Sequence, residues 1–209
     1  MVRVKICGIQ TPEQALAAAR LGADLLGLVF APSRRQVSMD RAVEIVAALQ
    51  GEPRRPELVG VFVNQPVKEV NCIALVCDLD YVQVHGDETP KYCEKICRPV
   101  IKAIWWAPWE GEEEITWRLD SYLEVCEDAL FILDTHAPGV YGGSGRSWDW
   151  ERASRLVRCG CPILVAGGLT PRNVARVVRT IHPWGVDVSS GVETKGHKDP
   201  AKIKAFIAA

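Results

Sequence analysis

Eight short β-branched runs alternate with helical stretches along this 209-residue chain, and this alternation limits the possible folds more than any single motif. The runs are apolar without strict alternation, which is typical of strands buried on both faces of a parallel sheet. Parallel strands joined by helices need right-handed crossovers. We predict a closed (β/α)8 TIM barrel, an α/β fold in which residues 1–209 form one domain. The predicted strands cover residues 4–7, 25–30, 58–63, 81–84, 100–104, 130–133, 162–165 and 185–188.

An open doubly wound sheet is the alternative fold, but no Gly-x-Gly-x-x-Gly dinucleotide signature follows the first strand. Several helices are expected to begin where a capping side chain precedes proline, whose missing N–H costs nothing in the first turn. These pairs are Thr11-Pro12, Thr89-Pro90, Thr170-Pro171 and Asp199-Pro200. We interpret the tryptophan-rich residues 105–117 as the loop after the fifth strand, running into the fifth helix.

Charge and cysteine content narrow the classes of partner and site. Lys and Arg total 25 and Asp and Glu 26, so the net charge of −1 gives no electrostatic reason to expect nucleic acid or an anionic membrane. No apolar run is long enough to span a bilayer. The eight cysteines are expected to be reduced thiols of a cytoplasmic protein. The spacings Cys93-x-x-x-Cys97 and Cys159-x-Cys161 do not fit a zinc site, so we predict no metal and no cofactor.

The active site of a (β/α)8 barrel lies at the carboxyl ends of its strands. Here the residues at those ends are mostly polar, although the strands themselves are apolar. Each of these residues alone is weak evidence for a site. Because the closed barrel brings all the strand ends together, we predict that they form one site around the barrel mouth. Its predicted members are Cys7, Phe30, Asn64, His85, Asp134, Gly167, Gly168, Ser189, Ser190 and Gly191.

The two glycine-rich strand ends predict a phosphate site. Loops after the seventh and eighth strands of such barrels often bind phosphate through backbone N–H groups. Gly167, Gly168 and Gly191 let the backbone come close to a ligand, and Ser189 and Ser190 add hydroxyl donors. The alternative is that the glycines only make tight turns. We expect a phosphorylated small-molecule substrate.

Cys7 and Asp134 are expected to face one cavity from opposite sides, as an acid–base pair that needs no metal. The alternative for Cys7 is a small buried hydrophobe, which is what most free cysteines are. A free thiol has a pKa of about 8.5, so Cys7 needs help to act as a base at neutral pH. Lys5, on the same face of the strand, is expected to supply positive potential and to pair with Asp187 inside the barrel.

Three further features are weaker signals. The glycine-rich run Gly142, Gly143, Ser144 and Gly145 is predicted to form a lid that excludes water, with an ordinary loop as the alternative. Arg34 and Arg35 follow the second strand, where one of them can grip a carboxylate with two hydrogen bonds, although adjacent loop arginines are more often only solvated. His85 is not expected to be the base.

Taken together, these motifs resemble the phosphoribosylanthranilate isomerase family of tryptophan biosynthesis. The similarity runs in order over nearly the whole chain, although the glycine-rich elements also occur in other phosphate-binding barrels. It rests on residues 5–8 (KICG), 62–64 (FVN), 82–88 (VQVHGDE), 133–135 (LDT), 142–145 (GGSG), 148–150 (WDW), 166–171 (AGGLTP) and 186–193 (VDVSSGVE).

The resemblance implies an Amadori rearrangement of N-(5-phosphoribosyl)anthranilate. It implies that Asp134 protonates the ribose ring oxygen and that Cys7 removes the proton from C2 of the opened sugar. It also places Arg35 against the anthranilate and the phosphate on the two glycine-rich ends. The further predicted substrate contacts are Gln83, His85 and Asp187.

Two other functions stay open at this point. One is the related aminoaldose-phosphate isomerase of histidine biosynthesis, which resembles a two-aspartate design; Cys7 at the first strand end argues against it. The other is a barrel that binds phosphate or a partner without catalysis, which would make the pairing of Cys7 with Asp134 a coincidence. A monomer is expected by default, and a homodimer is possible.

Overall fold

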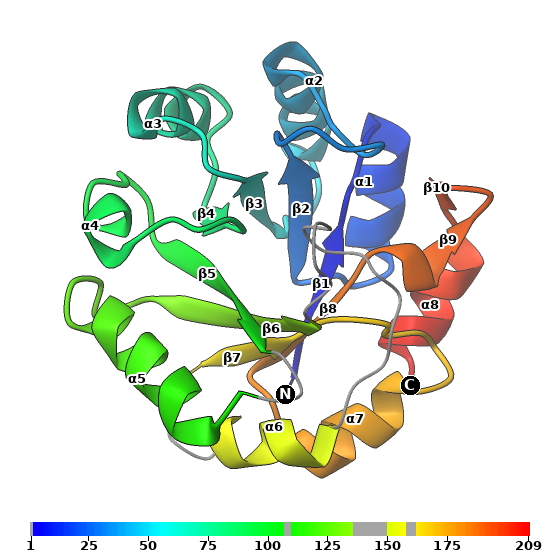
Figure 1. The fold of residues 1–209 in the computed structure, drawn as a ribbon. Coiled ribbons are helices and arrows are strands. Elements are labelled where there is room, and N and C mark those ends of the chain that lie inside the picture. The colour runs from blue at the N-terminus through cyan, green and yellow to red at the C-terminus, as the bar shows by residue number, and fades with distance from the viewer. Residues whose placement is uncertain (1, 107–109, 136–149, 158–161) are drawn as a thin grey trace.

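The computed structural model describes residues 2–106, 110–135, 150–157 and 162–209. Within them, eight parallel strands close into a barrel in chain order, as Figure 1 shows. The last strand pairs with the first, and Lys5 lies opposite Asp187 in that register. The predicted fold is therefore confirmed. The strands are β1 (Arg3–Cys7), β2 (Leu25–Val29), β3 (Glu57–Phe62), β4 (Tyr81–Val84), β5 (Val100–Trp106), β6 (Leu130–Thr135), β7 (Ile163–Val165) and β8 (Gly185–Val188).

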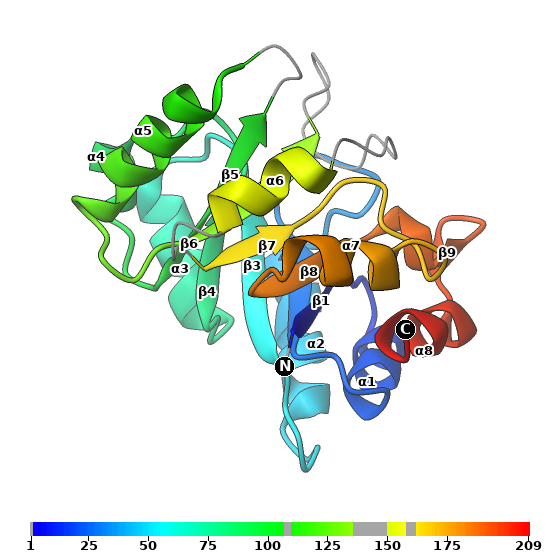
Figure 2. The ribbon, with the colours of Figure 1, turned by 90° about the horizontal axis from the view of Figure 1, so that it is seen from below.

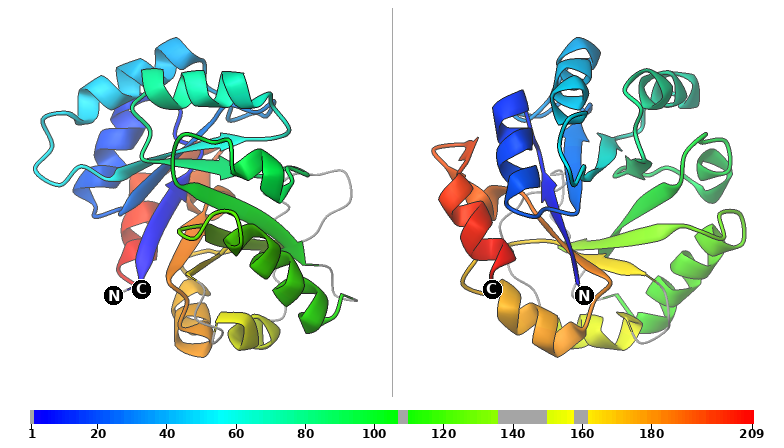
Figure 3. Two further views of the ribbon diagram at one scale, coloured as in Figure 1. Left: turned by 90° about the vertical axis from the view of Figure 1, so that its left-hand side faces the viewer. Right: turned by 180° about the vertical axis from the view of Figure 1, so that it is seen from behind.

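Helices form an outer ring around this barrel (Figures 1 and 3). The ring closes where the last helix packs beside the first, which Figure 2 shows from below. After β8 the chain makes a short 3-10 turn and a hairpin of β9 (Glu193–Thr194) and β10 (His197–Lys198). The helices are α1 (Pro12–Arg20), α2 (Met39–Leu49), α3 (Val67–Val76), α4 (Pro90–Cys93), α5 (Glu112–Leu123), α6 (Trp150–Val157), α7 (Val174–Ile181) and α8 (Pro200–Ile207).

The apolar core has two layers, because the two faces of each strand pack against different partners. One layer fills the space between the strands and the helices, where Ile6, Leu26 and Phe62 are fully buried. The other fills the barrel itself. The barrel core consists of Leu25, Val59, Ile101, Leu130, Ile132, Leu164 and Ala166. These buried side chains plug the barrel, so a ligand can enter only at its ends.

Two of the four predicted helix starts are confirmed by their capping hydrogen bonds. The Thr11 hydroxyl accepts from the Gln14 N–H, and the Asp199 carboxylate accepts from the N–H groups of the next turn. The predicted start at Thr89 is also confirmed, because α4 begins at Pro90, although this helix has only four residues and Thr89 makes no side-chain capping hydrogen bond. The prediction at Thr170 was wrong, because the next three residues form a turn and α7 begins only at Val174.

The tryptophan-rich segment was also assigned wrongly in part. Trp105 and Trp106 are the last residues of β5, paired with Asp134 and Thr135 of β6 rather than lying in a loop. Trp117 lies on α5 and is 71% exposed. The described residues contain no helix long and apolar enough to cross a membrane.

Candidate active site

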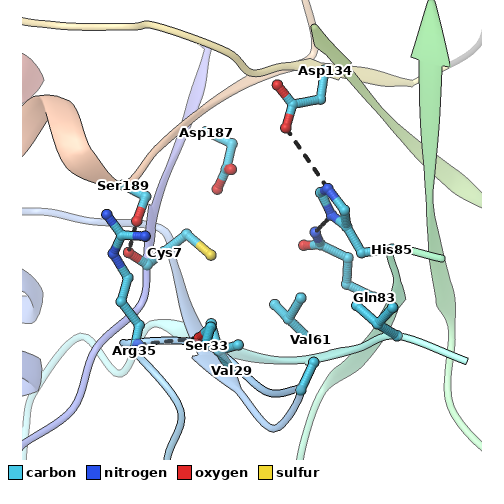
Figure 4. Close-up of a pocket in the computed structure, with 12 residues that line it drawn as sticks. Cys7, Val29, Ser33, Arg35, Val61, Gln83, His85, Asp134, Asp187 and Ser189 are labelled. Atoms are coloured by element: carbon cyan, nitrogen blue, oxygen red, sulfur yellow. Dashed lines mark hydrogen bonds and ion pairs between the residues drawn. The ribbon is translucent and has the colours of Figure 1, made fainter. Parts of the chain in front are cut away.

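The carboxyl ends of the strands surround a cavity of about 110 Å³ at one end of the barrel. Cys7 from β1 and Asp134 from β6 both line it, as predicted. Figure 4 shows them on opposite sides, with the Cys7 sulfur directed into the space between. Gln83, His85 and Asp187 complete the predicted set in the wall. The barrel thus brings together residues that are up to 180 positions apart in the chain, from Cys7 to Asp187.

The surroundings of Cys7 are dominated by buried charge. Lys5 is fully buried and its Nζ donates to Asp187 Oδ1 at 2.8 Å, which confirms the predicted ion pair. Burial raises the pKa of the Cys7 thiol, and the nearby Asp187 carboxylate raises it further. The Lys5 ammonium lowers that pKa but does not outweigh the other two effects. The expectation that Lys5 activates Cys7 is therefore met only in direction, because burial of the thiol raises its pKa more than the ammonium lowers it.

A chain of three side chains forms the opposite wall. Gln83 Nε2 lies 2.8 Å from His85 Nδ1, and His85 Nε2 lies 3.7 Å from Asp134 Oδ2. If the Gln83 amide donates to Nδ1, the His85 proton must sit on Nε2 and face the carboxylate. All three side chains are buried. The sequence placed all three in the site, but only the tertiary structure connects them.

A second hollow adjoins the first at the ends of β7 and β8. It is lined by the five residues that the sequence predicts for phosphate, and Asp134, Asp187 and Ser189 line both spaces. Gly191 lies so close to the Leu169 carbonyl that an added Cβ would be 1.8 Å from its oxygen, so only glycine fits. The predicted set Gly167, Gly168, Ser189, Ser190 and Gly191 is therefore one surface.

Arg35 lines the main cavity beside Ser33, whereas its neighbour Arg34 extends to the rim, with 64% of its side chain exposed. From the residues alone the two arginines could not be told apart, and only the resemblance singled out Arg35. Arg35 forms two hydrogen bonds to Glu193, at 2.7 and 3.0 Å. Lys198 donates to the same carboxylate at 2.7 Å. Neither Lys198 nor a site role for Glu193 was predicted.

The whole chain is similar to proteins of one known family. Residues 4–209 match the family model of N-(5′-phosphoribosyl)anthranilate (PRA) isomerase. An isomerase of that name from Dehalococcoides mccartyi is 46% identical over 208 residues, covering 99% of this chain and 94% of its own. One from a Roseiflexus species is also 46% identical, covering 100% and 97%. The chain belongs to the PRA isomerase family.

Solved structures of PRA isomerases share this barrel. The Thermotoga maritima enzyme superposes with a TM-score of 0.85 at 37% identity, covering 99% of this chain and 97% of that one. A PRA isomerase in complex with reduced 1-(o-carboxyphenylamino)-1-deoxyribulose 5-phosphate has a TM-score of 0.82 at 36% identity, with the same coverage. The matched relatives are isomerases, so the chain is an enzyme of this class.

Not every predicted site residue of this PRA isomerase family member reaches the cavity. The prediction for Phe30 was wrong, because its ring stacks on Phe62 in the outer core layer. Asn64 also lies outside the cavity lining, with its side-chain oxygen accepting from the Asp87 N–H. The predicted lid residues Gly142, Gly143, Ser144 and Gly145 lie outside the described residues.

The cysteines give no metal centre in the part of the chain that the structure describes. No group of three or more His, Cys, Asp or Glu side chains there could hold an ion. Cys93 is buried and Cys97 is exposed, so these two thiols lie in different environments. Burial raises the pKa of Cys93 to about 12, which keeps it protonated. Cys159 and Cys161 lie outside the described residues.

Proposed function

We propose that this protein converts N-(5′-phosphoribosyl)anthranilate into 1-(2-carboxyphenylamino)-1-deoxyribulose 5-phosphate, a step of tryptophan biosynthesis, with residues 1–209 as one catalytic domain. One observation carries the proposal. Cys7 and Asp134 face each other across a cavity that adjoins the hollow at the ends of β7 and β8. An acid and a base on opposite sides of a sugar, with an anion site beside them, suit the isomerisation of a phosphorylated aminoaldose.

In this mechanism Asp134 acts first, as the general acid. It gives its proton to the ribose ring oxygen, the bond between C1 and that oxygen breaks, and the anthranilate nitrogen lone pair forms a C=N bond to C1. Cys7 then takes the proton from C2. The C–H electron pair forms a C=C bond to C1 while the π pair of the C=N bond returns to the nitrogen, which gives the enolamine. A proton moves from the C2 hydroxyl to C1 to give the ketone. Asp134 regains a proton and Cys7 loses one before the next turnover.

The remaining residues bind and orient. The hollow formed by Gly167, Gly168 and residues 189–191 takes the phosphate, and its backbone N–H groups need no charged side chain to hold an anion. Arg35 takes the anthranilate carboxylate. Gln83, His85 and Asp187 contact the sugar between these two ends. This arrangement stretches the substrate across the barrel mouth, with its reacting carbons between Cys7 and Asp134.

The direct test is to mix the purified protein with freshly made N-(5′-phosphoribosyl)anthranilate and follow its fluorescence. Coupling to the next enzyme of the pathway identifies the product. We expect rapid conversion with no added metal or cofactor. If a folded protein gives no conversion, the proposal fails. The same assay with the histidine-pathway aminoaldose phosphate then tests the related isomerase, and binding of inorganic phosphate alone would favour a non-catalytic barrel.

Assembly and location remain predictions. We propose a monomer in the cytoplasm, with a homodimer as the alternative, and a Thermotoga maritima relative is described both as dimeric and as monomers generated from the dimer. Light scattering during size-exclusion chromatography decides between a mass near 23.1 kDa and twice that value.

A further inference from the structure

The hairpin after β8 holds a residue, Glu193, that bonds to the cavity residue Arg35, although neither strand of the hairpin belongs to the barrel. In the antiparallel pair β9 and β10, Glu193 lies directly opposite Lys198. The two residues between the strands, Lys195 and Gly196, both have positive φ, 51° and 84°. This is the backbone that a tight two-residue hairpin turn needs. The turn therefore fixes where the Glu193 carboxylate lies.

That carboxylate accepts hydrogen bonds from three cationic side chains. Its Oε1 accepts from Arg35 Nε and from Lys198 Nζ, both at 2.7 Å. Its Oε2 accepts from Arg35 Nη2 at 3.0 Å and from Arg34 Nη2 at 3.1 Å. Burial alone would raise the pKa of Glu193, but the hydrogen bonds from Arg35 and Lys198 outweigh it and lower that pKa to about 2. The carboxylate is therefore charged at neutral pH, with only 5% of the side chain exposed.

Gly8 confines Arg35 on another side. A Cβ added to Gly8 would lie 2.4 Å from Arg35 Cδ, so the arginine stem passes directly over this glycine. Gly8 also has a φ of +82°, a conformation that side chains rarely adopt. The stem is therefore packed against Gly8 while Glu193 holds the Nε–Nη2 edge of the guanidinium. Its Nη1 makes no hydrogen bond within the described residues, and Arg35 lines the cavity.

We propose that Glu193 is a positioning residue that turns the Nη1–Nη2 edge of Arg35 toward the ring carboxylate of the substrate. The inference rests on the proposed function, because it takes Arg35 as the group that binds anthranilate. A guanidinium has two edges that can each hold a carboxylate with parallel hydrogen bonds, and their geometry is strict. Glu193 occupies one edge. The other is then presented in one orientation before the substrate arrives, so less ordering is needed on binding.

A purely structural role for Glu193 is the competing explanation. Lys198 Nζ also donates to the Ser189 carbonyl at 3.1 Å, and Ser189 Oγ donates to the Cys7 carbonyl at 3.0 Å. Loss of Glu193 could therefore disturb the ends of β1 and β8 rather than Arg35. The test must separate an effect through Arg35 from an effect through Lys198.

The first measurement is steady-state kinetics of Glu193→Gln. We expect KM to rise about 10- to 100-fold, the loss typical when a partner that orients a binding side chain is removed. kcat should change less than about threefold, because the acid and base are untouched. Glu193→Asp keeps the charge and should recover part of the KM. The matched control is Glu52→Gln, which removes a carboxylate bonded to two nitrogens of Arg20 outside the cavity lining and should leave KM unchanged.

A double-mutant cycle shows whether Glu193 affects KM through Arg35 or through Lys198. In the Arg35→Ala background, Glu193→Gln should add no more than about a twofold change, because Glu193 then has no Arg35 to orient. If the two losses multiply instead, Glu193 acts through Lys198 and Ser189, and the positioning role is refuted.

A measurement without substrate separates this inference from the proposed function. The Arg35 Nε–H bound to Glu193 should exchange with solvent slowly in NMR, and Glu193→Gln should speed that exchange at least about tenfold. An unchanged exchange rate overturns the positioning role even if the wild-type protein converts its substrate. A wild-type protein that does not convert N-(5′-phosphoribosyl)anthranilate, but shows the exchange difference, refutes the proposed function and leaves Glu193 as the group that orders Arg35.

Discussion

The two sides of the barrel mouth are built differently. On the side of β1 and β8, buried charges neutralise one another: Lys5 pairs with Asp187, and Arg35 with Glu193. On the side of β4 and β6, the side chains of Gln83, His85 and Asp134 are buried next to one another. Gln83 Oε1 and His85 Nε2 are buried there without a hydrogen-bond partner among the described residues.

This difference indicates that one side of the mouth keeps the site in shape and the other side bonds to the ligand. The β1–β8 side is already satisfied, so it can hold its geometry while a ligand binds. The β4–β6 side has polar atoms in need of partners, and such atoms cost free energy until something bonds to them. A substrate that supplies those partners would gain affinity on that side. The predictions below test this contrast, in order of expected effect.

The largest effect should come from removing the proposed acid, Asp134, or the proposed base, Cys7. We expect Cys7→Ala and Asp134→Asn each to lower kcat about 10²- to 10⁴-fold, the usual contribution of general acid–base catalysis. Affinity for the reduced product analogue should change little, because neither variant removes a phosphate or carboxylate contact. Steady-state kinetics and calorimetric titration measure the two quantities. Unchanged turnover in both variants would reject the assigned roles.

Replacing one buried lysine on each side of the barrel mouth shows how much each ion pair contributes to the stability of the fold. Lys5→Met leaves the Asp187 carboxylate without its only hydrogen-bond donor among the described residues. We expect the free energy of unfolding to fall by about 3–5 kcal/mol. Lys102 near β4 is similarly buried and pairs with Glu88 at 3.0 Å. Urea unfolding of both variants measures the losses.

Lys102→Met should cost less than Lys5→Met. After that substitution Glu88 still accepts from the N–H groups of Asn64 at 2.7 Å and Gly86 at 2.8 Å. We expect the two losses to differ by at least about 1.5 kcal/mol, the net contribution of a hydrogen bond to a charged group. Equal losses would mean that remaining hydrogen bonds do not decide the cost of an unpaired carboxylate in this barrel.

Alanine substitutions at Gly8 and Gly22 distinguish the cost of backbone strain from the effect of displacing Arg35. Both have positive φ, but a Cβ on Gly22 would be no closer than 3.9 Å to its nearest neighbour. We expect Gly8→Ala and Gly22→Ala each to lower the free energy of unfolding by about 1–2 kcal/mol. Only Gly8→Ala should also raise KM, because its methyl group displaces Arg35. A raised KM in both variants would contradict the packing argument.

The smallest effect concerns the reactivity of Cys7. Its pKa is raised, so the thiolate is scarce at neutral pH, and the rate of alkylation by iodoacetamide should still be increasing about tenfold per pH unit between pH 7 and 8. Lys5→Met should slow alkylation, since Lys5 lowers this pKa, and Asp187→Asn should speed it, since Asp187 raises it. Peptide-resolved mass spectrometry distinguishes Cys7 from the exposed Cys72 and Cys97. A rate that is flat above pH 7 would show a lowered pKa instead.

The sequence by itself determined the barrel and most of its mouth. Eight β-α units leave few alternatives to closure, and closure places strand ends together whatever the loops do. Cys7, His85, Asp134 and the five residues predicted to bind phosphate could therefore be placed at the barrel mouth from where strands stop. The pairing of Lys5 with Asp187 followed from strand periodicity and from β8 lying beside β1.

Only the tertiary structure decided which polar residues face inward and which partners they meet. Phe30 and Asn64 also lie just after strands, yet the ring of Phe30 stacks in the outer layer and the side chain of Asn64 bonds to the loop after β4. Arg34 and Arg35 are adjacent in sequence and both bond to Glu193, 158 residues beyond Arg35, but only Arg35 is packed into the cavity wall. Local periodicity carries no information about such contacts, because they depend on where the hairpin after the last strand lies. For the same physical reason the raised pKa of Cys7 could not be predicted, since it depends on burial and on two charges brought together by folding.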